Sequence, residues 1–221
     1  MIARPLTIAV PKGRVLKVLG PLFGKAGLDA LTLDSDDRRL IHVTADGKMR
    51  FLLLKPDDVP TYVEFGAADL GVSGRDILLE RRYDLYQPLD LGIGRCRMVV
   101  AAPIDRSPTP DVPRIATKYP RIAADHFAAR GIQAEIIYVQ GSVELAPLVG
   151  LADLIVDLVE TGSTLKENRL VVIEEVTTIS SVLVANRAAY KLRAAEIMPL
   201  IAALRDAVSA SAKPASAVVG A

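Results

Sequence analysis

Short apolar runs alternate along the chain with segments in which apolar residues recur at helical spacing, and this alternation predicts an α/β fold. The first run, Leu6–Val10, has the character of a buried strand. Apolar side chains then recur every three or four positions from Val15 to Ala26, which predicts an amphipathic helix. Gly27 stands where the residue that ends such a helix in a left-handed conformation belongs.

The first half of the chain continues with a predicted hairpin and two predicted helices. The turn signal Asp46-Gly47 separates the apolar runs Leu40–Thr44 and Met49–Leu54, a pattern typical of a β-hairpin. Asp57–Pro60 is expected to open a helix, because acids at the start and proline in the first turn suit a helix N-terminus. Ser73, with an acid three residues on, is expected to cap the next helix.

A second series of strands and helices begins at Arg114. Pro120–Arg130 is predicted to be helical, Ser142 is expected to cap a helix ending at Val149, and Ala188–Arg205 is predicted to form one long helix. The remaining predicted strands are Asp69–Val72, Leu85–Leu91, Arg97–Ala102, Ile115-Ala116, Glu135–Val139, Asp153–Leu158, Leu170–Ile173 and Thr178–Ala185.

Two such series, joined by long strand-like passages, predict two lobes with two crossing segments, Gly94–Ala102 and Glu174–Ala185. We expect lobe I to comprise residues 1–93 plus 177–208 and lobe II residues 94–176. Residues 209–221 are expected to form a flexible tail. A ligand is expected in the cleft between the lobes.

The composition narrows the class of protein. The formal net charge of +1 gives no global field that would hold nucleic acid or an anionic membrane. The single cysteine, Cys96, excludes an internal disulfide framework, and its strand-like surroundings favour a structural thiol over a reactive nucleophile. No apolar run reaches the ~18 residues of a membrane span, and the first residues lack the apolar core of a secretion signal. We therefore expect a cytoplasmic protein without nucleic-acid or membrane partners.

The stretch Asp153–Leu165 carries the clearest chemical signal. A strand is followed by an acid, a loop rich in small hydroxyl residues and a helix start. Thr161–Thr164 can present consecutive backbone N–H groups and hydroxyls to one phosphate, and Gly162 allows close approach because it has no Cβ. Asp157, near the carboxyl end of the strand, is placed to accept hydrogen bonds from sugar hydroxyls. The alternative is a plain helix N-cap, in which Ser163 or Thr164 satisfies unpaired backbone donors.

Several segments together resemble the ATP phosphoribosyltransferase family, and they span nearly the whole chain in the order found in that family. These segments are Ala9–Arg14, Pro60–Val72, Arg95–Pro103, Ile115–Pro120, Gly141–Pro147 and the acid–hydroxyl loop as far as Asn168.

The resemblance implies a two-lobed fold similar to type II periplasmic binding proteins. It also implies that the hydroxyl loop, Thr161, Gly162, Ser163 and Thr164, binds the 5-phosphate of phosphoribosyl pyrophosphate. Asp157 is implied to bind the ribose hydroxyls, and Glu160 in the same loop to contact ribose or magnesium.

The length of the chain is similar to that of the family's short form, because nothing after Arg205 has the length of a further regulatory domain. The resemblance therefore implies a separate histidyl-tRNA-synthetase-like regulatory subunit, assembled with this chain in a hetero-octamer, and a homodimer of the chain itself. Mg²⁺ is expected to arrive with the substrates' phosphates, because no spacing of Asp, Glu or His in the sequence encodes a dedicated metal cage.

The implied reaction is attack by adenine N1 of ATP on the anomeric carbon of phosphoribosyl pyrophosphate, with loss of pyrophosphate. Adenine N1 carries a free lone pair at neutral pH, so the main demand is electrostatic stabilisation of phosphates. Lys12 and Arg14 follow the first strand and are the first candidates for this role. Arg50 and Lys55 bracket an apolar strand, and the resemblance assigns them to pyrophosphate or ATP phosphates, with a dimer interface as one setting. The alternative for all four is a solvated turn or strand end.

Further candidates for binding ATP have equally simple structural explanations. Gly13 allows close approach beside the two cations that flank it. Ser73 and Glu144 are interpreted either as ligand contacts or as features of helix N-termini. Arg97 and Lys118 are candidates for phosphate contacts, and the alternative for Arg97 is a residue that only flanks a strand.

The main rival hypothesis is a ligand-binding module with the same two-lobed plan, because a fold does not determine a function. The acid–hydroxyl loop favours a phosphorylated sugar over an amino acid as ligand. An interaction scaffold, the third hypothesis, explains neither the loop nor the cations.

Overall fold

The computed structural model describes residues 4–28, 39–106 and 108–212. Within this part the chain divides into two compact units, each with its own sheet. Unit 1 consists of the residues up to Leu78, of Tyr83–Gly94 and of the residues from Ser180 onward, and unit 2 of Leu79–Arg82 and Arg95–Ile179. The predicted α/β class is confirmed.

The described residues of unit 1 form a six-stranded sheet with strand order β2-β3-β1-β4-β11-β5. The strands β1, β3 and β4 are parallel, whereas β2, β11 and β5 join in antiparallel fashion. The elements of this unit are β1 (Leu6–Pro11), α1 (Arg14–Lys25), β2 (Ile41–Val43), β3 (Met49–Leu54), the 3-10 turn η2 (Pro56–Asp58), α2 (Val59–Glu64), β4 (Leu70–Gly74), α3 (Arg75–Arg81, whose last residues belong to unit 2), β5 (Tyr86–Asp90), β11 (Ser181–Ala185), α7 (Arg187–Leu192) and α8 (Ala194–Ala212).

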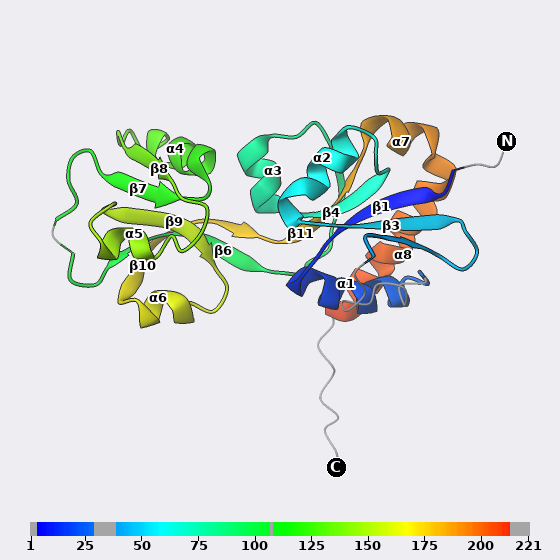
Figure 1. Cartoon of the computed structure of the whole chain (residues 1–221), viewed down its shortest axis with the longest axis horizontal. Coiled ribbons are helices and arrows are strands. Elements are labelled where there is room, and N and C mark those ends of the chain that lie inside the picture. The colour runs from blue at the N-terminus through cyan, green and yellow to red at the C-terminus, as the bar shows by residue number, and fades with distance from the viewer. Residues whose placement is uncertain (1–3, 29–38, 107, 213–221) are drawn as a thin grey trace, which may run out of the picture. The chain divides into compact units, whose positions relative to one another are not determined.

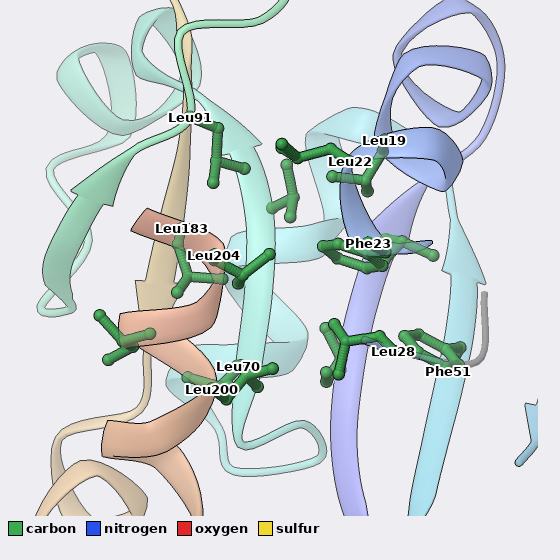
Figure 2. Packing of buried hydrophobic residues seen from close by; sticks show 14 of the residues in the cluster. Leu19, Leu22, Phe23, Leu28, Phe51, Leu70, Leu91, Leu183, Leu200 and Leu204 are labelled. Atoms are coloured by element: carbon green, nitrogen blue, oxygen red, sulfur yellow. The ribbon is translucent and has the colours of Figure 1, made fainter. Parts of the chain in front are cut away.

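Helices cover both faces of this sheet, with α1 and α8 on one face and α2 on the other (Figure 1). The main core lies under α1 and α8, where Phe23 of α1 stacks at a tilt on Phe51 of β3, with 5.9 Å between ring centroids. Figure 2 shows leucines from α1, β4, β11 and α8 that belong to the same core as this pair. Fully burying such a side chain contributes about 1.5–3 kcal/mol, so this packing holds the sheet in shape.

The described residues of unit 2 form a five-stranded sheet with strand order β10-β6-β9-β7-β8. The strands β7, β8 and β9 are parallel, and β6 runs antiparallel to its neighbours β9 and β10. One face packs against α4, and the other packs against α5 and α6 (Figure 1). The elements of this unit are β6 (Cys96–Pro103), β7 (Arg114–Thr117), α4 (Pro120–Ala128), β8 (Glu135–Tyr138), α5 (Leu145–Leu148), β9 (Leu154–Val159), α6 (Ser163–Glu167) and β10 (Leu170–Ile179).

Two local predictions are confirmed by backbone geometry. Gly27 has φ +74° and follows α1, while the Leu28 N–H donates to the Phe23 carbonyl and closes the helix end. The hairpin at Asp46-Gly47 is also present, because β2 and β3 pair in antiparallel register.

Two predicted helix caps are wrong. Ser73 lies inside β4, opposite Val182 of β11, and its hydroxyl donates to the Gly74 carbonyl, so the strand continues past it and the helix begins at Arg75. Ser142 adopts φ +48°, and its backbone carbonyl accepts the Leu145 N–H. The cap position of α5 is occupied by Glu144.

The single helix expected over Ala188–Arg205 is wrong as well. The chain forms α7 and α8 with a break at Arg193, whose guanidinium donates to the buried carboxylate of Asp69 at 2.8 Å. Arg4 binds the same carboxylate at 2.6 Å, so a network from distant segments sets the break. Residues 209–212, expected to belong to the tail, form the end of α8, and residues 213–221 lie outside the described residues.

We predict that Gly71→Ala destabilises unit 1 by about 1–3 kcal/mol through overpacking. A Cβ at this position would lie 2.7 Å from Val63 Cγ2 and 2.9 Å from Val59 Cγ1, between β4 and α2. Gly24→Ala in α1 is the matched control, because its Cβ meets no atom within 4 Å and alanine favours a helix. Urea unfolding of the two variants checks this, and equal stability would contradict it.

Candidate active site

In unit 2 the functional candidates gather at one edge of the sheet. Because β7, β8 and β9 are parallel, their carboxyl ends meet at that edge. Lys118 follows β7, and Asp157 lies near the end of β9, which is flanked by β6 and β7. The buried Thr117 hydroxyl donates to the Val156 carbonyl at 2.7 Å and accepts the Tyr119 N–H at 2.9 Å, so it ties the end of β7 to β9.

Asp157 occupies an unusual position for an acid. It lies on the same face of β9 as the buried residues Ile155 and Val159, and its Oδ1 accepts the Leu158 N–H at 2.8 Å. Burial raises the pKa of its carboxyl, and the nearby carboxylate of Glu144 raises that pKa further. The Leu158 N–H and the ammonium of Lys118 act in the opposite direction. The site thus holds a largely desolvated carboxyl under the influence of one acid and one cation.

The loop after β9 turns sharply into α6. Gly162 takes the cap position of that helix with φ +82°, a conformation that other residues adopt only with strain. The Thr161 and Ser163 hydroxyls lie 3.1 Å apart, and the Ser163 N–H points to the Thr161 hydroxyl at 3.4 Å. Leu165, in the first turn of α6, is buried in the core of unit 2 and so fixes the start of the helix to that core.

The alternative that Ser163 or Thr164 serves only as the helix cap is not supported, since the cap position is occupied by Gly162, which has no side chain. The hydroxyls of Thr161, Ser163 and Thr164 and the side chain of Glu160 stand in exposed positions. Exposed donors on a rigid turn suit an anion that comes from solvent.

Arg97 lies at the same edge of the sheet, on the neighbouring strand β6. It lies opposite Val159, because β6 is antiparallel to β9 and therefore begins where β9 ends. Its guanidinium lies 3.5 Å from the Glu175 carboxylate of β10, so the two side chains form an ion pair at the surface.

In unit 1 the candidate cations follow the ends of parallel strands. Lys12 comes after β1 and Lys55 after β3, and the Lys12 N–H donates to the Leu54 carbonyl at 2.8 Å. Gly13, with φ +92°, is the cap residue of α1, and Arg14 begins the helix. These residues therefore share one edge of the sheet with the end of β4, where Ser73 is buried.

Arg50 does not join these cations. It lies second in β3, opposite Thr7 and Val43, at the end of the strand away from Lys55. Its guanidinium donates to the Thr7 hydroxyl at 3.1 Å. Five residues of extended chain span roughly 16 Å, so the structure does not place Arg50 in the same group as Lys55. The interpretation as a strand-end residue fits better for Arg50.

Thr117 was not singled out in the sequence. A threonine at the end of an apolar run is ordinary in a strand, and nothing in the sequence indicates that its hydroxyl bridges two strands.

Comparison with known proteins identifies the family of the chain. Residues 55–206 match HisG, described as ATP phosphoribosyltransferase. The ATP phosphoribosyltransferase of Sorangium cellulosum is 68% identical over 210 residues, covering 95% of this chain and 99% of the relative. This chain belongs to the ATP phosphoribosyltransferase family. The prediction of a phosphoribosyl-transferring enzyme is thereby confirmed.

Solved structures support both the family and the fold. The ATP phosphoribosyl transferase (HisG:HisZ) complex from Thermotoga maritima matches with a TM-score of 0.81 and 35% identity, over 94% of this chain and 100% of the matched one. The sulphonate-binding protein SsuA from Escherichia coli matches with a TM-score of 0.59 at 14% identity, over 95% of this chain and 74% of SsuA. The second match shows the fold alone, and it confirms the predicted likeness of this phosphoribosyltransferase to periplasmic binding proteins.

We predict that Asp157→Asn is more stable than the wild type at neutral pH. The pKa of Asp157 is raised above its ordinary value of 3.8 by burial, so the folded protein retains this proton to a higher pH than the unfolded chain does. Stability is therefore lost as the pH rises through the folded-state pKa, and asparagine, which cannot ionise, avoids this loss. The gain should disappear below the unfolded value of 3.8.

Urea unfolding of the two proteins across acidic and neutral pH measures this difference. A variant that is less stable than the wild type at neutral pH would contradict the electrostatic description of Asp157.

Proposed function

We propose that the chain transfers the phosphoribosyl group of phosphoribosyl pyrophosphate to N1 of the adenine of ATP, giving N1-(5-phosphoribosyl)-ATP and pyrophosphate, the first step of histidine biosynthesis. The observation that carries the proposal is the pairing of a half-buried acid, Asp157, with an exposed turn of hydroxyl and backbone donors within unit 2. Family membership supports the reaction class.

In this proposal unit 2 holds the phosphosugar. The N–H groups and hydroxyls of Thr161–Thr164 bind the 5-phosphate, which replaces solvent at the exposed turn. The Asp157 carboxylate accepts hydrogen bonds from the ribose hydroxyls, which offset its burial. Glu144, close enough to raise the pKa of Asp157, and Glu160 are proposed to contact the same sugar or its metal.

The cations of unit 1 are proposed to hold pyrophosphate or the phosphates of ATP. Lys12, Arg14 and Lys55 share a sheet edge, and Gly13 between the first two leaves their backbone open to a phosphate. As C1 separates from pyrophosphate, negative charge collects on the leaving group and these side chains stabilise it. The adenine N1 lone pair attacks without prior deprotonation, so the proposal needs no general base.

Mg²⁺ is proposed to arrive bound to the substrates' phosphates. Among the described residues there is no group of three or more His, Cys, Asp or Glu side chains arranged to hold a metal ion. The carboxylates near Asp157 suit a shared role, since Mg²⁺ commonly takes one or two protein carboxylates and completes its shell with phosphate oxygens and water. Bound in that way, the ion would neutralise part of the pyrophosphate charge.

We further propose that the chain acts as a short-form catalytic subunit, as a homodimer within a hetero-octamer with a histidyl-tRNA-synthetase-like regulatory subunit. The Thermotoga relative was solved as a HisG:HisZ complex, and this chain covers that relative completely. A cytoplasmic location stays a prediction from composition. None of the helices in the described ranges is long and apolar enough to cross a bilayer.

The rival binding module would bind phosphoribosyl pyrophosphate without consuming it. Release of pyrophosphate on mixing ATP and phosphoribosyl pyrophosphate, with phosphoribosyl-ATP followed by absorbance, tests the proposal. Binding of both compounds without any product, with and without the regulatory subunit, would favour the module.

We predict that Asp157→Asn weakens binding of phosphoribosyl pyrophosphate roughly ten- to hundred-fold, because hydrogen bonds to a charged group contribute about 1.5–3 kcal/mol. Isothermal titration calorimetry measures the change. Asp153→Asn is the control, since Asp153 precedes the same strand at its other end and is paired with Arg114 at 3.1 Å. Equal affinity of the Asp157 variant and the wild type would show that Asp157 does not bind phosphoribosyl pyrophosphate.

We predict that Arg14→Ala lowers kcat/KM by about 10²–10³, the usual effect of deleting one donor from an anion-stabilising site. Arg50→Ala should stay within a few-fold of the wild type, because Arg50 lies at the opposite sheet edge on Thr7. Steady-state kinetics on both variants distinguishes the two arginines. Equal losses in both would refute this separation of roles.

A further inference from the structure

A small cavity opens at the other edge of the unit 2 sheet, where β7 and β9 begin. Its volume is about 220 Å³, and most of its wall comes from the loop between β6 and β7 and from the turn between α5 and β9. Figure 1 shows this loop beyond the beginning of β9. The residues proposed to hold the phosphosugar follow the opposite ends of these strands, so the cavity is separate from that site.

The wall of the cavity is rich in proline and largely apolar. Four prolines line it, and proline has a fixed φ and no N–H. Arg114 closes one side, held by Asp153 at 3.1 Å and by the Gly150 carbonyl at 3.1 Å. A wall that is already ordered loses little entropy when it binds something. The four prolines are Pro103, Pro108, Pro110 and Pro147.

Several residues next to the cavity wall in the sequence have exposed apolar side chains. Each lies within two residues of one that lines the cavity, and Val149 is 65% exposed. Solvent-exposed apolar groups gathered around a pocket are typical of a protein–protein contact. These side chains are Ile104, Val112, Leu145, Leu148, Val149 and Leu151.

The size of the cavity favours a side chain over a free ligand. Pockets for drug-sized ligands span about 300–1,000 Å³, and this one is smaller. It suits one large apolar side chain from a partner, the arrangement of an interface anchor.

The charges at the rim indicate what else the partner presents. Arg114 is neutralised by Asp153, and Asp105 is neutralised by Arg169 at 2.6 Å. Arg106 lines the cavity, and within the described part of the chain its guanidinium has no ion-pair or hydrogen-bond partner. A carboxylate on the partner would complement it.

A second copy of this chain fits this surface poorly. In a two-fold symmetric contact the same patch meets itself, so Arg106 would have to pair with an acid of this same patch. The nearby acids, Asp105 and Asp153, already have partners. The Thermotoga relative, in contrast, was solved with a different protein, so a surface for a hetero-partner has a precedent in the family.

We propose that this edge of unit 2, comprising the proline-lined cavity, its apolar rim and Arg106, docks the regulatory subunit, which inserts one apolar side chain and pairs a carboxylate with Arg106. The inference rests on the proposed function for the identity of the partner.

Val149→Asp and Arg106→Glu test the surface, with the regulatory subunit of the same organism, purified separately, as the probe. Each substitution should raise the Kd for that subunit at least ten-fold, measured by sedimentation velocity or biolayer interferometry. Leu192→Asp is the matched control, because Leu192 is 85% exposed in unit 1, and its Kd should stay within two-fold of the wild type. The mass of the catalytic subunit alone should be the same in all variants.

Unchanged binding in both cavity variants would overturn the docking surface. A loss of self-association with intact binding of the regulatory subunit would overturn it too, by assigning the surface to a second copy.

Pyrophosphate release by the wild type is measured in parallel. If the wild type turns over and binds the subunit, and the variants bind equally well, only the docking surface is refuted. If the wild type shows no turnover, the proposed function is refuted. A wild type that turns over but does not bind the subunit refutes the docking proposal.

Discussion

The half-buried carboxyl of Asp157 is the group on which this account of the molecule depends. An ionised acid in such surroundings is unfavourable, because the Leu158 N–H and the ammonium of Lys118 offset burial and the neighbouring Glu144 only in part. A sugar that offers hydroxyl hydrogens can supply the missing stabilisation. The residue therefore makes more physical sense with a ligand bound than without one, which is common at functional sites.

The arrangement of the strands explains why the candidates fall into two groups. Parallel strands bring their carboxyl ends to one edge, so residues far apart in the chain become neighbours there. In unit 2 this edge carries the acid and the hydroxyl turn, and in unit 1 it carries Lys12, Arg14 and Lys55. In our proposal one unit offers donors for a phosphosugar, and the other offers cations for phosphates. The opposite edge of unit 2, with its cavity, is left available for a different role.

Much of the fold was predictable because it follows from local pattern. Strand runs, the Asp46-Gly47 hairpin and the left-handed Gly27 depend on a few neighbouring residues. The break at Arg193 was not predictable, because it depends on the burial of Asp69, 124 residues away. Arg50 is a different case, since its place at the start of a strand already sets it apart from Lys55, which follows the strand.

The candidate site was predictable to a similar extent. The turn after β9 stands out in the sequence because acid, glycine and hydroxyl residues are adjacent, whereas the bridge from Thr117 to β9 depends on register between strands. The most direct test of the central claim is a crystal structure with phosphoribosyl pyrophosphate bound. It should show the 5-phosphate on the backbone N–H groups of Thr161–Thr164 and the ribose hydroxyls on Asp157. A phosphosugar held elsewhere, with this turn vacant, would contradict the account.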